Sequence, residues 1–232
     1  MLPPVISLIN ERFRHGRPSN DLSKAGVLVH MFDHTEDSLQ KWRGCPNHQT
    51  VVEGHKPGDV GNGDCLATGN RFSSSLIWKG HSPVFGGGGG IIFRPEHVRV
   101  ICGYGGDGGS RHGEDDGCGT NWCPPSEVDD PHGWCDGRPY RPTNLVDMLQ
   151  AWSARSTTYN ELIVDVATYE ASLPYSIEAV IFDSTVHRQI ILYYQAQGIS
   201  ISEVDLPLVF FDTNNEETPF STIPNELLRV PW

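Results

Sequence analysis

The chain has 232 residues, of which 38% are apolar and 20% charged, and its formal net charge at pH 7 is −12. This apolar share is too high for a disordered chain, and we expect a single domain over residues 1–232. The acidic balance argues against non-specific binding to nucleic acid or to anionic membranes, because such binding needs a basic face. The sequence has no apolar run near the ~20 residues of a transmembrane helix, and its start lacks the features of a signal peptide.

The pattern of apolar residues predicts an α+β fold with short strands. The first 27 residues are polar and suggest a helical or irregular entry. The glycine run 86–90 predicts a flexible connection, and the residues after 211 form a polar tail. Apolar runs predict strands over 26–32, 72–78, 91–93, 98–102, 162–164, 177–182 and 206–211.

Two further segments have helical signals. Thr143 is a candidate N-cap for a helix over 144–153, whose apolar residues recur at helical spacing. Ser184 or Thr185 is a candidate cap for a second helix that ends at the glycine at position 198.

The cysteines predict disulfides within a Cys- and Gly-rich insertion at about 102–142. An even count, concentrated in loop-like sequence, favours up to three disulfides in an oxidising compartment, and hence a secreted protein. A zinc site completed by His112 and His132 is the alternative, and free thiols are a third reading. The six residues are Cys45, Cys65, Cys102, Cys118, Cys123 and Cys135.

Residues 107–117 combine carboxylates with glycines, which is a composition suited to Ca²⁺. Their spacing does not match an EF-hand, so the sequence favours a solvated acidic turn. We expect no metal to be required.

Three segments carry the chemistry that the sequence suggests. The first contains Phe13-Arg14 and then Arg17-Pro18, the second is Phe72-Ser73-Ser74-Ser75, and the third is Tyr159-Asn160-Glu161, followed by Leu173-Pro174-Tyr175-Ser176-Ile177. Each segment adjoins a predicted strand or leads into one.

Taken together, these segments resemble the ADP-ribosyltransferases of the Arg–Ser–Glu class, which contains the cholera- and pertussis-type toxins. The first motif of that class is an aromatic residue and Arg, then Arg-Pro-Pro and a short helix that ends in Gly. Here Ser19 replaces the second proline, and one residue fewer separates the two arginines. The resemblance implies short mixed or antiparallel strands in two packed sheets, with flanking helices and a disulfide-rich loop insertion.

The resemblance also implies that the chain uses NAD as its substrate and cleaves the nicotinamide–ribose bond. In this reading Glu161 stabilises an oxocarbenium-like state, Ser73 orients Glu161, and Arg14 holds the phosphates. The other expected NAD-binding residues are Arg17, Ser74, Ser75 and Tyr159.

Tyr159 departs from the toxin class, which has Glu or Gln at this position to place the acceptor. The Tyr159-Asn160-Glu161 segment is instead similar to the corresponding strand of poly(ADP-ribose) polymerases. The acceptor therefore stays open between a protein side chain, a nucleotide and water. The alternative function is a catalytically silent secreted module that binds glycan or protein through Trp122 and Trp134.

Overall fold

The chain folds into an α+β structure, which confirms the predicted class at that level. None of the helices in the part described below is long and apolar enough to span a membrane. The helical elements are α1 (Pro4–His15), α2 (Leu22–Ala25), the 3₁₀ turn η1 (Pro95–His97) and α5 (Leu145–Ser153). The computed structural model describes residues 4–32, 71–81, 89–104, 143, 145–153, 160–165, 177–183, 207–212 and 214–223.

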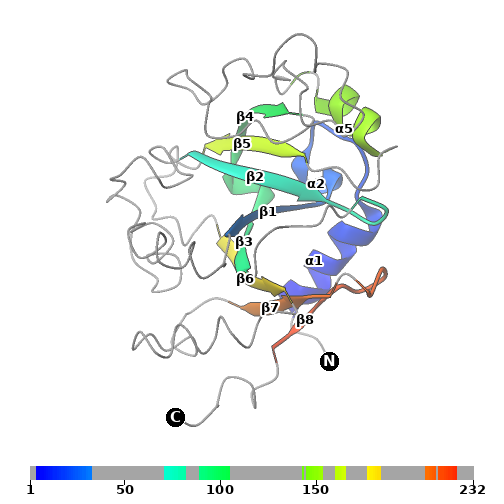
Figure 1. Ribbon diagram of the computed structural model, residues 1–232, viewed down its shortest axis with the longest axis vertical. Coiled ribbons are helices and arrows are strands. Elements are labelled where there is room, and N and C mark those ends of the chain that lie inside the picture. Colours follow the sequence, from blue (N-terminus) through cyan, green and yellow to red (C-terminus); the bar gives the residue numbers. More distant parts are fainter. Residues whose placement is uncertain are drawn as a thin grey trace.

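Eight strands form one continuous sheet in the order β4-β5-β2-β1-β3-β6-β7-β8 (Figure 1). Neighbouring strands are antiparallel, except that β6 and β7 are parallel. The pairing is continuous through β1, which pairs with β2 on one side and with β3 on the other, and the two packed sheets that the resemblance implies stay a prediction. The strands are β1 (Val27–Phe32), β2 (Arg71–Ile77), β3 (Gly89–Phe93), β4 (Arg99–Tyr104), β5 (Glu161–Asp165), β6 (Ile177–Asp183), β7 (Leu208–Phe211) and β8 (Phe220–Thr222).

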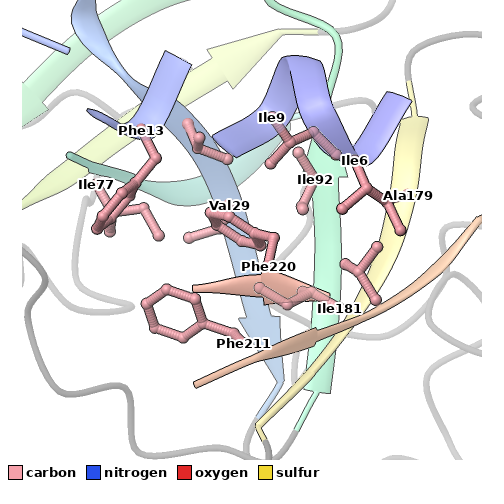
Figure 2. Close-up of a cluster of buried hydrophobic side chains, with 12 residues drawn as sticks. Ile6, Ile9, Phe13, Val29, Ile77, Ile92, Ala179, Ile181, Phe211 and Phe220 are labelled. Carbon is pink, nitrogen blue, oxygen red and sulfur yellow. The ribbon is translucent and has the colours of Figure 1, made fainter. Parts of the chain in front are cut away.

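One face of the sheet is covered by α1, as Figure 2 shows. Ile6, Ile9 and Phe13 recur at helical spacing, so they form one apolar side of the helix and pack against buried residues of six strands. Phe13 makes edge-on contacts with Phe211 and Phe220, whose ring centroids lie 6.4 and 5.8 Å away. Such aromatic pairs add about 0.5–1.5 kcal/mol each beyond the burial of their area.

The opposite face receives α5, through residues that the helical spacing predicted. Leu145 and Met148 are buried. They approach Gly103 of β4 so closely that a Cβ atom at Gly103 would lie 3.0 Å from the Met148 sulfur and 3.1 Å from Cδ2 of Leu145. Glycine at this position therefore allows α5 to pack directly on the sheet. The N-terminus of α5 is bound from a distant part of the chain, since the Val146 N–H donates to Asn20 Oδ1 at 3.3 Å.

A buried asparagine of α1 binds the last strand. Asn10 Oδ1 accepts from the Phe220 N–H at 3.0 Å, and its Nδ2 donates to the Phe220 carbonyl at 2.7 Å. Because Phe220 also pairs with Phe211 of β7, the asparagine supplies hydrogen bonds of the kind that a further strand would make.

A buried ion pair connects α1 to β6. The side chains of Arg12 and Glu178 are 10% and 5% exposed and are hydrogen-bonded to each other. The pairing of β3 with β6 shifts between Ile92 and Phe93, opposite Glu178, and such an irregularity redirects the side chain of the extra residue. Burial raises the pKa of Glu178 above its ordinary value of 4.5, although the charge of Arg12 opposes this shift.

Most predicted strands are confirmed within a residue or two, but two interpretations were wrong. Gly89 and Gly90 are not part of a connection, because they belong to β3 and pair with Phe32 and Met31 of β1. The expected polar tail contains β8, whose Phe220 is fully buried. The helix predicted over 184–198 lies outside the described residues.

We predict that Glu178 makes stability depend on pH. Since the folded protein holds this proton more tightly than the unfolded chain, the stabilisation is present at low pH and is lost as pH rises through the raised pKa. Urea unfolding should therefore show the wild type losing stability relative to Glu178→Gln as pH rises from about 4.5 through the raised pKa. A difference between the two proteins that stays constant over this range would contradict the prediction.

Candidate functional site

The candidate site lies where β5 begins beside the end of β2. The register pairs Ser73 with Ile163 and Ser74 with Leu162, so continuing it by one residue places Ser75 opposite Glu161. Ser75 also pairs with Val29, a residue that packs against α1. Because directly opposed residues share a face of the sheet, Glu161 lies on the face that carries α1. It is 2% exposed.

The residue before Glu161 is fixed by a dense set of buried hydrogen bonds. Asn160 Oδ1 accepts from the Leu76 N–H at 2.8 Å, and Asn160 Nδ2 donates to the Leu76 carbonyl at 2.8 Å. The Ser75 hydroxyl donates to the Asn160 carbonyl, also at 2.8 Å. All three residues are at most 1% exposed. Two consecutive residues of β2 therefore determine where β5 starts.

The Asn160 amide also contacts the turn that follows β2. Its Nδ2 lies 3.2 Å from Nε2 of His81, a fully buried residue whose ring stacks on Trp78 with centroids 4.3 Å apart. Since Nδ2 can only donate, Nε2 accepts from it when the His81 ring is neutral and carries its proton on Nδ1. Backbone bonds in both directions between Trp78 and His81 close the turn.

The same turn binds the end of α1, beside which it lies in Figure 1. The Lys79 N–H donates to the Phe13 carbonyl at 2.8 Å. Gly16 permits this close approach, because a Cβ atom there would lie 2.6 Å from Cβ of Trp78. The turn therefore binds Phe13, the residue before Arg14, and it also binds Asn160, the residue before Glu161.

Arg14 is an exposed residue in the last turn of α1. The hydrogen bond from Lys79 is the largest cause of a lowered pKa of Glu217. The charges of Lys79 and of Arg14 lower this pKa further. The Arg14 guanidinium therefore has a carboxylate nearby, and its Nε lies 3.4 Å from Nε2 of His15. Arg14 belongs to a helix, which agrees with the helical or irregular entry that the first 27 residues suggest.

Arg17 lies in the exposed segment between α1 and α2, and its N–H donates to the Lys24 carbonyl at 3.2 Å. Asp21 caps α2, where hydrogen bonds from Lys24 and Ser23 lower its pKa to about 2. The short helix ends at Gly26. A short helix that ends in glycine after an Arg-Pro pair is the arrangement that the first motif implies.

The predicted serines differ in what their hydroxyls do. Ser73 belongs to β2, and only its backbone is described. The Ser75 hydroxyl donates to the Asn160 carbonyl, whereas the buried Ser74 hydroxyl has no hydrogen-bond partner among the described residues. Their expected roles in binding NAD stay predictions.

Several predicted features fall outside the described residues. These are Tyr159, Trp122, Trp134, the 107–117 loop and five of the six cysteines; Cys102 is buried in β4. Within the described ranges, no group of three or more His, Cys, Asp or Glu side chains is arranged to hold a metal ion.

Asn160 and His81 belong to the site although the sequence does not indicate a role for either. Asn160 is the middle residue of the Tyr159-Asn160-Glu161 motif, and nothing in the local sequence indicates that its amide binds Leu76. A polar residue directly before an apolar strand is the one available signal, and it is also typical of exposed loop ends.

A pocket of about 730 Å³ lies elsewhere, against the start of β4. It includes neither Glu161 nor Arg14, so we do not assign it to the candidate site. Its lining residues are Asn20, Asp21, Leu22, Pro95, Val98, Arg99, Val100, Ile101 and Leu145.

The arrangement combines a buried carboxylate, an adjacent strand of serines and an exposed guanidinium. The carboxylate is suited to stabilising positive charge, which it does more strongly where water is excluded. The guanidinium is suited to binding phosphate. Comparison with protein families, curated proteins and solved structures found no match to this chain.

Adjacent serines provide a test of this local structure. We predict that Ser75→Ala lowers the free energy of unfolding by about 1–2 kcal/mol, because it leaves the buried Asn160 carbonyl without this donor. Ser74→Ala should be neutral or stabilising, because it removes a buried hydroxyl that makes no hydrogen bond. Urea unfolding compares the two, and equal losses would contradict the arrangement.

Proposed function

We propose that the protein is an NAD-dependent ADP-ribosyltransferase or NAD glycohydrolase with an ADP-ribosyltransferase-like fold. The observation that carries this proposal is the placement of Glu161 at the start of β5, beside the serine strand β2. Arg14 lies at the end of a helix that is bound to the turn after β2. The three segments that suggested the family from sequence are thus connected through one part of the sheet.

Glu161 has the central chemical role in this proposal. Cleavage of the nicotinamide–ribose bond develops positive charge on the ribose, and a carboxylate beside the sugar lowers the energy of that state. Glu161 is 2% exposed. The substrate therefore reaches its carboxylate only when the groups around it move.

Arg14 is the proposed anchor for the phosphates of NAD. Its guanidinium offers several donors in a planar fork, which suits bidentate binding of phosphate oxygens. Arg17 assists from the segment that leads to α2, while Ser73 orients Glu161. Ser74, Ser75 and Tyr159 complete the proposed NAD-binding set.

The acceptor of the ADP-ribosyl group is proposed only by class: a protein side chain, a nucleotide or water. Tyr159 stands where the toxin class carries Glu or Gln, so acceptor placement differs from that class. On the resemblance we also propose that the protein is toxin-like. On the number and spacing of its cysteines we propose that it is secreted and contains disulfides. Transfer to water releases nicotinamide without a second substrate, which makes hydrolysis the simplest reaction to test.

We predict that Glu161→Gln lowers the rate of nicotinamide release from NAD by about 100-fold or more, in the range found when one group that stabilises a transition state is removed. The substitution keeps the size of the side chain and removes its charge. Chromatographic detection of nicotinamide measures the rate, and an NAD-induced rise in melting temperature measures binding separately.

Glu11→Gln is the matched control, because Glu11 is an exposed carboxylate of α1 that has no role in the proposal. It should release nicotinamide at the wild-type rate. The proposal fails if Glu161→Gln is as active as this control. It also fails if the oxidised wild-type protein neither releases nicotinamide nor gains thermal stability with NAD.

A further inference from the structure

The amide of Asn160 lies one residue before the proposed catalytic carboxylate. We propose that Asn160 is the positioning residue of this site. Through Leu76 and His81 it fixes the backbone at the start of β5, and thereby the direction in which the Glu161 side chain leaves the strand. The catalytic part of this inference rests on the proposed function.

The first argument is the way in which β2 and β5 stop pairing. The regular register ends with Ser74 and Leu162, and Asn160 precedes the first residue of β5. Leu76 is nevertheless satisfied on this side, because its N–H and carbonyl both bind the Asn160 side chain. A side chain thus continues the pairing beyond the end of the strand, at the residue next to Glu161.

The second argument is that the Asn160 backbone is held as well. Its carbonyl accepts from the Ser75 hydroxyl at 2.8 Å. On the other side of β5, Glu161 pairs with Tyr104 of β4. The peptide that joins Asn160 to Glu161 is therefore fixed from both neighbouring strands, which leaves the Glu161 backbone little freedom to rotate.

The third argument is the chemistry of the side chain. The groups around the Asn160 side chain require one acceptor, for the Leu76 N–H, and two donors, for the Leu76 carbonyl and for His81 Nε2. Asparagine supplies all three groups at this length. Aspartate has no donor, and leucine has neither donor nor acceptor, so neither of these residues of similar size reproduces the set.

Asn10 provides an internal comparison. Its amide makes the same two bonds to a strand backbone, through Oδ1 to the Phe220 N–H and through Nδ2 to the Phe220 carbonyl. It joins α1 to β8, at the opposite end of the strand order from β5. Losing its amide should weaken the fold in a similar way without moving Glu161.

The experiment compares Asn160→Ala with Asn10→Ala in the complete protein. For nicotinamide release, we expect Asn160→Ala to lower kcat by about 10- to 100-fold while KM for NAD changes by less than about 3-fold, since misplacing a catalytic group costs rate rather than binding. Asn10→Ala should keep kcat within about 3-fold of the wild type. Equal losses of kcat in the two variants, or a loss confined to KM, would overturn the proposal.

If Asn160→Ala does not fold, Asn160→Asp is the variant to compare, with Asn10→Asp as its control. It keeps an acceptor for the Leu76 N–H and removes both donor bonds, so kcat should again fall more than in Asn10→Asp. A smaller loss than in Asn10→Asp would overturn the proposal.

A second measurement tests the positioning role of Asn160 without depending on nicotinamide release. In NMR of the labelled protein, Asn160→Ala should speed hydrogen exchange of the Leu76 amide and shift the carboxyl ¹³C resonance of Glu161, whereas Asn10→Ala should change neither. If the wild type releases no nicotinamide and does not bind NAD, the proposed function is wrong and this readout still decides the positioning role. An unchanged Glu161 resonance in Asn160→Ala would overturn that role.

Discussion

The pairing of the Asn160 side chain with the Leu76 backbone is the interaction on which the candidate site depends. Leu76 lies in a central strand, so its N–H and carbonyl need partners on the side away from β1. An unpaired buried amide group costs about 1–3 kcal/mol, and Asn160 satisfies both groups with one side chain. Without this amide, β5 would have to begin at another residue or leave two polar groups unsatisfied.

The turn after β2 extends the effect of this pairing to the opposite end of the site. His81 accepts from Asn160, while Lys79 donates to the last apolar residue of α1. The turn is itself rigid, because backbone bonds and stacked rings join Trp78 to His81. The positions of Arg14 and Glu161 are therefore coupled through a few hydrogen bonds, although 146 residues separate them in the sequence.

Local patterns predicted the strands because each buries a short apolar run, and they predicted α5 because its apolar residues recur at helical spacing. They could not predict β8, since only Phe220 of its three residues is apolar and its burial depends on Phe13 of α1. The order of the strands could not be predicted either, because β2 pairs with β5 across more than 80 residues of sequence. The roles of Asn10 and Asn160 arise only when these distant segments meet.

The hydrogen bonds between Asn10 and Phe220 affect whether another copy of this chain can add a strand at β8. An edge strand with unpaired N–H and carbonyl groups is a template for strand addition, which leads to intermolecular sheets and aggregation. At β8, the groups of Phe220 are occupied by a helix side chain, and the strand has only three residues. Within the part of the chain that the structure describes, Asn10 thus occupies the two backbone groups of Phe220 through which another strand could add to β8.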